Sequence, residues 1–265
     1  MNPEILNVTD IIAYLYCPRK FYLKKIKGIK EKPNKFMIKG KIKHEIFDIF
    51  NKNEKNIVMN ITRKIKKEEI LELYRTEALK ITNQIINLHK EVLSKFRLSS
   101  FDILHEILSS LEKEINLRIE SVNKGIEKDY FGEELWENLS PKYLSEVEVI
   151  SENLALKGRI DRLELGNKII PYEIKTRNEI YEEDKLQLAG YVLILEDRFK
   201  KEIGIGIIET ENDREEIKIN KELKDKFLEI ANEVRTLLRE KKALPINSNF
   251  RKCQNCKFQD ICFSE

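Results

Sequence analysis

The chain has 265 residues, of which 36% are charged and 41% are hydrophobic, with only 9 Gly and 6 Pro. This composition excludes collagen-like, Pro/Gly-rich and fully disordered proteins, and the length allows one large domain or two small ones. The longest purely aliphatic run, residues 192–195, is too short to cross a membrane, and the first residues lack a signal-peptide pattern. We therefore expect a cytoplasmic protein with no membrane partner.

The formal net charge is only +3, but the positive charges are unevenly placed. Residues 17–43 contain 11 Lys or Arg and a single acid, Glu31, and residues 235–257 are also basic. This distribution is typical of a protein that binds a polyanion on one side, although a solvated lysine-rich face would look the same. The side chains that we expect to contact nucleic acid are Arg19, Lys20, Lys24 and Lys41.

The N-terminal residues 7–28 are predicted to form a helix that is capped near Thr9 or Asp10, is broken at Pro18 and then resumes. Three aromatic side chains in this segment have two interpretations. They could stack on the bases of a nucleic acid, or they could be core residues, which their helical spacing favours. These residues are Tyr16, Phe21 and Tyr22.

A second amphipathic helix is predicted over residues 35–50, where apolar side chains recur at helical spacing. A connector rich in Lys and Asn follows at residues 51–57. Long helical patterns with hardly any Gly or Pro then extend from about residue 66 to residue 125. We expect this block to be a helical insertion.

The hydrophobic period changes to two after residue 140, which indicates strands. Alternating patterns predict five short strands, at residues 145–150, 154–165, 168–175, 203–210 and 214–219. Helices are predicted at about 182–198, between the third and fourth strands, and at about 221–241. Together these elements predict a mixed α/β fold.

Three of the four cysteines form a C-x2-C-x5-C pattern at Cys253, Cys256 and Cys262, and Cys17 is the fourth. A C-x2-C turn lets two thiolates bind one metal. Four thiolates around one centre fit either tetrahedral zinc or an iron–sulfur cluster, and the spacing does not distinguish them. Disulfides, the other interpretation, are disfavoured by the expected intracellular location.

Residues 158–175 contain two predicted strands that carry acidic side chains and a lysine. Glu173 and Lys175 are two positions apart, so they share a face of an extended strand. Asp161 lies on the preceding strand. Two carboxylates that converge across a hairpin can hold a divalent cation, and a neighbouring Lys can orient a water molecule. The alternative is an ordinary charged surface hairpin, because E-x-K triplets are common.

The length of the connecting loop decides whether the carboxylates meet. A two-residue turn on the Gly-Asn pair would place Asp161 opposite Tyr172 and turn Glu173 to the other face. We therefore predict a three-residue loop around Asn167, or a bulge near Pro171, either of which brings the two acids to one face.

Three further side chains suit such a site. Gln187 and Tyr191 are four residues apart on a predicted helix, so an amide and a phenol lie on one side and could reach a phosphate or its water network. His44 lies on a helix in the basic region, and imidazole is a good ligand for manganese and similar ions. A single histidine is otherwise more often structural.

Together these pieces resemble the RecB-like branch of the PD-(D/E)xK nucleases, and within it the CRISPR-associated exonuclease family, the "Cas-four" proteins. The matching motifs run in the order of that family. They are Y-C-P-R-K-F-Y-L with Cys17, G-x3-H ending at His44, G-R-I-D at Asp161, E-I-K at Glu173 and Lys175, Q-x3-Y at Gln187 and Tyr191, and the cysteine trio. The six motifs in order are specific, whereas residues 60–140 carry no matching motif.

The resemblance implies a RecB-like nuclease core in which helices flank a mixed sheet. It further implies a helical insertion and a C-terminal iron–sulfur segment tied to the N-terminal helix. The implied [4Fe-4S] cluster is held by Cys17, Cys253, Cys256 and Cys262. The implied Mn²⁺ or Mg²⁺ site is formed by His44, Asp161, Glu173 and the carbonyl group of Ile174. The implied catalytic residues are Asp161, Glu173, Lys175, Gln187 and Tyr191.

The motifs divide the chain into four predicted segments. These are residues 1–60, with the N-terminal helices, the first cluster cysteine and the motif histidine; residues 61–140, the helical insertion; residues 141–245, the nuclease core; and residues 246–265, the iron–sulfur segment.

The activity that the resemblance implies is a metal-dependent single-stranded DNA exonuclease. It would trim DNA ends before spacer integration, and its partners would be single-stranded DNA and a CRISPR integrase complex. Two alternatives are a non-catalytic iron–sulfur adaptor that binds DNA and the nuclease module of a helicase–nuclease repair complex. The sequence contains no G-x4-G-K-[ST] motif, so a motor in such a complex would be on another chain.

Overall fold

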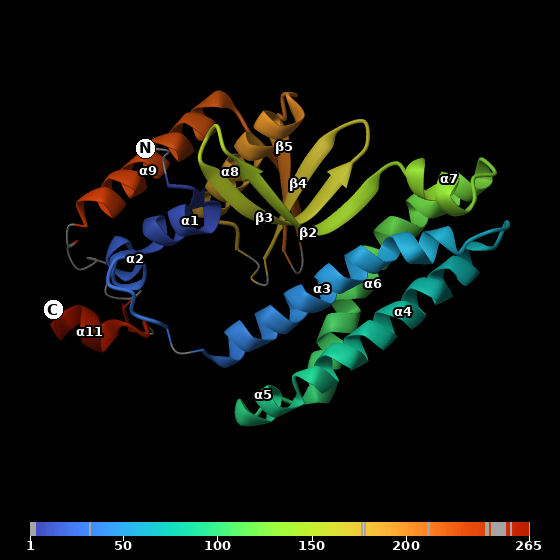
Figure 1. Cartoon of the computed structure of the whole chain (residues 1–265), viewed down its shortest axis with the longest axis horizontal. Helices are drawn as coiled ribbons and strands as arrows, with labels where there is room; N and C mark the ends of the chain where they lie inside the picture. Colours follow the sequence, from blue (N-terminus) through green and yellow to red (C-terminus); the bar gives the residue numbers. More distant parts are fainter. Residues whose placement is uncertain are drawn as a thin grey trace. The chain divides into compact units, whose positions relative to one another are not determined.

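The computed structural model describes residues 4–31, 33–175, 177, 179–210, 213–241, 244, 253–254 and 256–264. The chain divides into two compact units (Figure 1). The sheet unit comprises Met1–Lys32, Val147–Arg162 and Ile170–Glu265, and the helical unit comprises Pro33–Glu146 and Leu163–Ile169. Both units are discontinuous in sequence, whereas the four segments expected from the motifs are contiguous. That motif-based division stays a prediction.

A mixed sheet, most of whose residues belong to the sheet unit, has six strands within the described part of the chain, in the order β1-β3-β4-β5-β6, with β2 paired to β3. β1 is parallel to β3, β4 is parallel to β5, and β6 is antiparallel to β5. The five predicted strands are present with shifts of up to three residues at their ends. β1 was not predicted, because two residues carry no detectable period. The strands are β1 (Leu6–Asn7), β2 (Lys142–Ser151), β3 (Leu156–Leu165), β4 (Ile169–Ile174), β5 (Ile205–Glu209) and β6 (Arg214–Lys218).

Helix α8 (Glu182–Phe199) is the crossover that the parallel β4–β5 pair requires. It packs against α1 (Val8–Tyr16) and α9 (Lys221–Glu240), as Figure 1 shows. α8 and α9 match their predicted spans closely. They approach closely at Gly190, where an added Cβ would lie only 2.5 Å from Cζ of Phe227.

The predicted N-terminal helix is two helices, α1 and α2 (Pro18–Lys25). The cap of α1 is Asn7, whose side chain accepts a 3.2 Å hydrogen bond from the N–H of Thr9, so the cap predicted at Thr9 or Asp10 was wrong by two or three residues. Cys17 caps α2 in an extended conformation. The predicted break at Pro18 is confirmed, because α1 ends at Tyr16 and α2 begins at Pro18. Pro18 occupies the first turn of α2, where its missing N–H needs no partner.

The aromatic residues of this segment are mostly core residues. Phe21 and Tyr22 are only 2% and 5% exposed, whereas Tyr16 is 47% exposed. Tyr22 packs with Leu23 and Phe258 in a small cluster, close to α11 (Gln259–Ser264). The core interpretation is therefore confirmed for Phe21 and Tyr22.

The helical unit contains a long first helix, α3 (Lys35–Met59). The connector predicted at residues 51–57 was wrong, because this segment continues α3 and buries Ile57 and Val58 on the same stripe as Phe50. The unit also contains α4 (Lys67–Leu88), α5 (Lys90–Lys95), α6 (Ser100–Glu127) and α7 (Gly132–Glu137).

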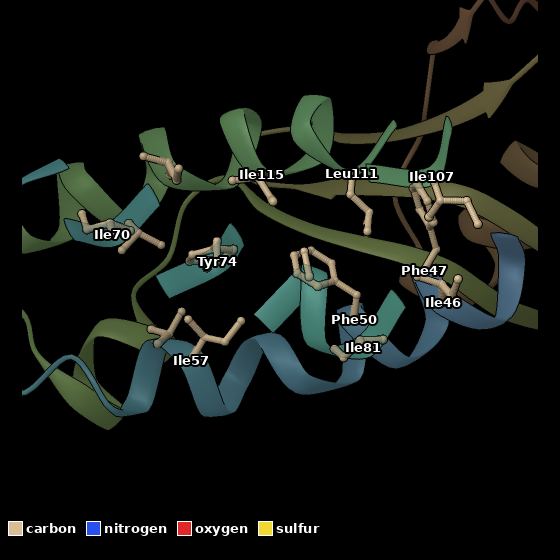
Figure 2. Packing of buried hydrophobic residues seen from close by; sticks show 14 of the residues in the cluster. Ile46, Phe47, Phe50, Ile57, Ile70, Tyr74, Ile81, Ile107, Leu111 and Ile115 are labelled. Atoms are coloured by element: carbon tan, nitrogen blue, oxygen red, sulfur yellow. The ribbon is translucent and has the colours of Figure 1, made fainter. Parts of the chain in front are cut away.

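The helices of this unit bury a hydrophobic core of their own (Figure 2). Phe50 of α3, Tyr74 of α4 and Leu111 of α6 are among its buried side chains. The core extends from Ile42 to Leu139, wholly within the helical unit, as expected for a separate compact unit. Although several helices are long, none of those in the described residues is apolar enough over its length to span a membrane.

Candidate metal and catalytic site

A three-residue loop joins β3, which ends at Leu165, to β4, which begins at Ile169. Within the loop, the N–H of Gly166 donates to the carbonyl of Lys168 at 3.1 Å. The predicted three-residue loop is therefore confirmed. Because the period of a strand is two, this odd loop length is the one that places Asp161 and Glu173 on the same face.

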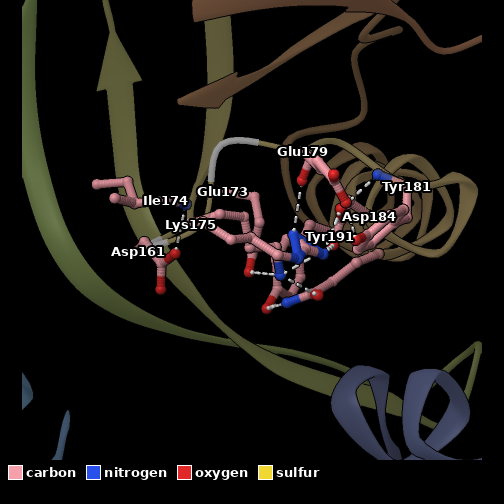
Figure 3. A network of polar contacts seen from close by, with 10 residues as sticks. Asp161, Glu173, Ile174, Lys175, Glu179, Tyr181, Asp184 and Tyr191 are labelled. Carbon is pink, nitrogen blue, oxygen red and sulfur yellow. Dashed lines mark hydrogen bonds and ion pairs between the residues drawn. The ribbon is translucent and has the colours of Figure 1, made fainter. Parts of the chain in front are cut away.

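The two carboxylates of the hairpin lie on adjacent strands, with Lys175 beside them (Figure 3). Oδ2 of Asp161 accepts a 2.6 Å hydrogen bond from the main-chain N–H of Ile174. Oε1 of Glu173 accepts one from Nζ of Lys175 at 2.7 Å. The other oxygen of Glu173, Oε2, is buried and has no hydrogen-bond partner among the described residues. A buried carboxylate oxygen without a partner is unfavourable, so a cation at this position would be stabilised.

The environment of Glu173 disfavours its negative charge. Burial raises the pKa of Glu173 to about 8, the charge of Asp161 raises it as well, and the charge of Lys175 lowers it. Two carboxylates in a poorly solvated place are both ionised most readily when a cation lies between them. Carboxylate oxygens are the ligands that Mg²⁺ and Mn²⁺ prefer, so this pair fits a divalent metal.

Lys175 is surrounded by acceptors. Its Nζ donates to Oε1 of Glu173 at 2.7 Å and to Oε1 of Gln187 at 3.1 Å, and it lies 3.2 Å from Oδ1 of Asp184. Burial lowers the pKa of Lys175, but the negative charges of Glu173 and Asp184 outweigh burial, so the pKa is raised. Lys175 is thus an ammonium group that donates hydrogen bonds, and it does not suit the role of a general base.

Gln187 and Tyr191 of α8 belong to the same network, as their spacing suggested. Nε2 of Gln187 donates to the phenol oxygen of Tyr191 at 2.9 Å, while its Oε1 accepts from Lys175. Both side chains are buried. Gly158 of the G-R-I-D motif leaves room for this arrangement, because a Cβ there would come within 2.7 Å of the Tyr191 ring.

Asp184 is a member of the network that the sequence analysis missed. It is 2% exposed, and its two oxygens bind Nη2 of Arg177 at 2.7 and 2.6 Å. Its Oδ2 also accepts from the N–H of Tyr181 at 2.8 Å, which caps α8. The acid three residues into the helix was a detectable capping signal. The contact with Lys175 was not detectable, since it depends on how α8 packs beside β4.

His44 lies on α3 in the helical unit, and its Nδ1 is 2.7 Å from Oε1 of Glu146. Glu146 is a partner of His44 that the sequence analysis missed. It is buried and has φ of 53°, which is unusual for a residue other than Gly. The alternating S-E-V-E pattern indicated only a strand. The role of His44 as a metal ligand stays a prediction.

The four basic residues predicted to contact nucleic acid have different environments. Arg19 is buried, and its Nη1 donates to the carbonyl of Leu244 at 3.1 Å, so its placement is that of a structural residue. Lys20 forms an ion pair with Glu31 at 3.2 Å. Lys24 and Lys41 are exposed. The contacts of these side chains with nucleic acid stay predictions, and exposure suits Lys24 and Lys41 best.

The four cysteines line one pocket of the sheet unit, together with Lys20 and Phe258; they are Cys17, Cys253, Cys256 and Cys262. All four are free thiols, and the Sγ of Cys17 accepts a 3.4 Å hydrogen bond from the N–H of Lys20. Desolvation raises the pKa of Cys253, and the charges of the other three cysteines add to this effect. A set of four thiolates therefore needs a positive centre, and these donors fit an iron–sulfur cluster or zinc. Residues 246–252, 255 and 265 of the predicted iron–sulfur segment lie outside the described residues.

A hairpin that presents Asp161, Glu173 and Lys175 from a mixed sheet, followed by a crossover helix, defines a metal-dependent nuclease of the PD-(D/E)xK class. The family model described as the PD-(D/E)XK nuclease superfamily matches residues 5–263. The chain therefore belongs to this superfamily, whose enzymes use divalent metals. The predicted resemblance and the mixed α/β nuclease fold are confirmed.

A curated relative gives a narrower comparison. It is a "CRISPR-associated exonuclease Cas4/endonuclease Cas1 fusion" from Leptospira interrogans serogroup Icterohaemorrhagiae serovar Lai (strain 56601), and it is 27% identical over 163 residues. The match covers 56% of this chain and 30% of the relative, so the chain spans less than a third of that protein.

Among solved structures, the crystal structure of SSO0001 has 21% sequence identity and a TM-score of 0.31, covering 66% of this chain and 79% of that chain. A TM-score this low does not establish a common fold.

Proposed function

We propose that this protein is a metal-dependent exonuclease that trims single-stranded DNA ends for CRISPR spacer acquisition. Membership of the nuclease superfamily supports hydrolysis of a phosphodiester. The relative whose name joins an exonuclease to the endonuclease Cas1 supports a CRISPR integrase complex as the partner. The main support for metal-dependent hydrolysis is the Asp161–Glu173 pair, in which one buried oxygen of Glu173 has no hydrogen-bond partner among the described residues.

The residues that would hold Mn²⁺ or Mg²⁺ are Asp161 and Glu173, together with the carbonyl of Ile174 and, by resemblance, His44. A bound divalent ion would lower the pKa of a water molecule and neutralise charge on the scissile phosphate. The Ile174 N–H already fixes the orientation of the Asp161 carboxylate. Burial of Glu173 keeps bulk water from competing for its oxygens.

Lys175 would act as a donor beside the metal ligands. Its ammonium group can orient the attacking water or stabilise the negative charge that develops on the phosphate. Gln187 accepts from Lys175 and is itself held by Tyr191, so these two residues of α8 would keep the ammonium group in place. Of the four basic residues predicted to contact nucleic acid, the exposed Lys24 and Lys41 would follow the DNA backbone.

The four cysteines would bind a [4Fe-4S] cluster. The donors come from the start of α2 and from the C-terminal residues, so the cluster would join the two ends of the sheet unit. Because metal binding is linked to folding, loss of one cysteine should destabilise both ends. The main-chain donor to Cys17 is of the kind that tunes cluster potentials.

A nuclease assay on anaerobically purified protein tests the catalytic proposal. End-labelled linear single-stranded DNA should be shortened from an end in Mn²⁺ or Mg²⁺, while circular single-stranded DNA should stay intact. D161N and E173Q should be inactive. E148Q is the matched control, since Glu148 is an exposed acid of the same sheet that pairs with Arg159. Binding of DNA without degradation would instead favour the adaptor alternative.

The absorption spectrum and the iron and sulfide content test the cluster. A brown protein with four irons per chain is expected, and C17S or C256S should lose the colour and unfold at lower temperature. A colourless protein with stoichiometric zinc would contradict the iron–sulfur assignment.

An integration assay tests the CRISPR partner. A purified integrase complex should insert shorter, defined fragments when this protein is added to DNA with single-stranded overhangs. When D161N is added instead, the inserts should have the same length as they have without this protein. Identical insert lengths with active protein and with D161N would contradict a role in spacer trimming.

A further inference from the structure

The ammonium group of Lys175 has three acceptor oxygens close to it in this structure, two in hydrogen bonds and one in an ion pair. An ammonium group has three donors. Its acceptors are Oε1 of Glu173 at 2.7 Å, Oε1 of Gln187 at 3.1 Å and Oδ1 of Asp184 at 3.2 Å. Of these acceptors, Glu173 is also a residue that would hold the metal, and a metal ion would compete with Lys175 for its oxygens.

We propose that Asp184 is a positioning residue, which holds the Lys175 ammonium group while Glu173 binds the metal. This inference rests on the proposed function. When Glu173 binds the metal, Lys175 keeps Asp184 and Gln187 as acceptors. Its third N–H is then directed toward the attacking water or the phosphate, next to the Glu173 carboxylate. Asp184 acts through Lys175 and does not itself touch the reacting atoms.

Asp184 is fixed firmly enough to position another side chain. It is 2% exposed, and both of its oxygens bind Nη2 of Arg177. Arg177 in turn lies over the ring of Tyr181, 4.4 Å from its centre, and the N–H of Tyr181 donates to Asp184 (Figure 3). A buried carboxylate held between two cations is fixed in its place. The network therefore provides a rigid anchor on the side of Lys175 away from Asp161.

A simple capping role for Asp184 is the alternative explanation, because the residue also caps α8. The helical unit contains a matched case. Glu69 stands at the same position in α4, and its Oε1 accepts from the N–H of Lys66 at 3.1 Å. Glu69 has a capping role without a catalytic lysine, and its Oε2 also lies 3.6 Å from Nη2 of Arg63. E69Q therefore measures what the loss of a capping acid that pairs with an arginine does to stability and rate.

The experiment compares D184N, R177Q and E69Q with the wild-type protein. D184N should lower kcat about 10–100-fold with little change in KM, because a misplaced catalytic group loses rate without losing substrate binding. R177Q leaves Asp184 and its hydrogen bond from the N–H of Tyr181 in place, so it should also lower kcat, but by a smaller factor. E69Q should lower the Tm and leave kcat unchanged.

A second readout is independent of activity. In the metal-free protein, the Lys175 ammonium group should give a slowly exchanging ¹H–¹⁵N signal, assigned by its loss in K175A. D184N should weaken this signal and E69Q should not. An unchanged signal and unchanged kcat in D184N, with a lower Tm, would overturn the proposal in favour of a capping role. Absence of wild-type nuclease activity would overturn the proposed function, while the ammonium signal would still test the contact.

The helical unit carries an independent inference about His44. Oε1 of Glu146 lies 2.7 Å from Nδ1 of His44, and a carboxylate accepts hydrogen bonds. Nδ1 is therefore the protonated nitrogen, and Nε2 carries the lone pair that a metal ligand needs. We infer that Glu146 sets the tautomer of His44 and so selects Nε2 as the ligand atom. This inference also rests on the proposed function.

Glu146 is placed by a buried network of the helical unit. Its neighbour Ser145 accepts a 2.9 Å hydrogen bond at Oγ from Nη2 of Arg118, and its carbonyl accepts from Nδ2 of Asn51 at 3.2 Å. Both contacts fix Ser145, the residue directly before Glu146, which has a positive φ. Arg118, which lies in the region between residues 61 and 140 that carries no family motif, thereby helps to place the partner of His44.

Histidine ¹⁵N chemical shifts of the metal-free protein test this second inference. The wild type and E146Q, which keeps an acceptor, should show Nδ1–H on His44, whereas E146L should shift toward the Nε2–H form. E146L should also weaken Mn²⁺ binding about 10–100-fold. The matched control is E45L, because Glu45 pairs with His89 at 2.8 Å in the same unit. It should alter only the His89 signals. An unchanged His44 tautomer and an unchanged Mn²⁺ affinity in E146L would overturn the inference.

Discussion

Each unit of the molecule buries a network of opposite charges, and the two networks differ in how completely they are satisfied. In the helical unit, Arg118 is 1% exposed and donates to Glu54 at 3.1 Å and to Glu114 at 2.7 Å. Tyr74 donates to the second oxygen of Glu54 at 3.1 Å. In the sheet unit, Glu173 binds Lys175 with one oxygen, and its other oxygen has no hydrogen-bond partner in the described residues.

This difference separates a structural network from a functional one. Burial raises the pKa of both Glu54 and Glu173, so a raised pKa does not by itself identify a catalytic carboxylate. Both oxygens of Glu54 have partners, whereas Glu173 retains an oxygen for a ligand. A buried polar group without a partner calls for an explanation, and a bound metal ion would be one for Glu173.

The largest expected effect comes from exchanging the buried glutamate of each unit for glutamine. E173Q should lower kcat about 1,000-fold or more, because a metal ligand supplies several kcal/mol of transition-state stabilisation. E54Q should keep kcat within about threefold and lose about 1–3 kcal/mol of stability, since its hydrogen bonds to Arg118 become weaker. Single-turnover kinetics and urea unfolding measure the two effects. A large activity loss in E54Q would show that the comparison is wrong.

Replacement of the basic side chain of each network, Arg118 or Lys175, tests how much that network contributes to stability. R118M should lower the free energy of unfolding by about 3–5 kcal/mol, because it leaves Glu54 and Glu114 buried without their partner. K175M should instead lose activity with a smaller stability change, since Glu173 can take up a proton. Urea unfolding at pH 7 checks both variants. Equal destabilisation by R118M and K175M would contradict the distinction.

The pH dependence of the metal-free protein isolates Glu173. Its folded-state pKa of about 8 lies above the ordinary value of 4.5. Between these values the unfolded chain loses a proton that the folded protein keeps. Stability should therefore fall as the pH rises from 4.5, by about 2–4 kcal/mol at pH 8, and level off above it. Urea unfolding in EDTA at pH 5.5 and pH 8.5 measures the fall, which E173Q should reduce. The same pH dependence in E173Q would refute this origin.

The smallest expected effects concern two tightly packed glycines. G190A in the sheet unit should lose about 1–3 kcal/mol, because the added Cβ meets the fully buried ring of Phe227 at 2.5 Å. G125A in the helical unit meets a terminal methyl group of Leu135, which can rotate away, and the helix gains from alanine. It should change stability by about 1 kcal/mol or less. Thermal unfolding separates the two, and an equal loss would show that Leu135 is as rigid as Phe227.

Local signals in the sequence determined much of the fold and part of the site. The change of hydrophobic period located five strands and α8 and α9 within a few residues, because side-chain periodicity follows directly from backbone geometry. The parity of the β3–β4 loop followed from the need for Asp161 and Glu173 to share a face. The i, i+4 spacing likewise placed Gln187 beside Tyr191.

Only the tertiary structure decided which other charges surround these residues. Three charge pairs join side chains that are 9 to 102 positions apart in sequence. They are Lys175 with Asp184, His44 with Glu146, and Glu54 with Arg118. No local pattern encodes such pairs, since each depends on how helices and strands pack. Burial was decided in the same way, so basic Arg19 became a structural residue and the polar segment at residues 51–57 became helical. Local geometry follows from neighbouring residues, whereas burial and charge pairing follow from contacts that exist only once the chain is folded.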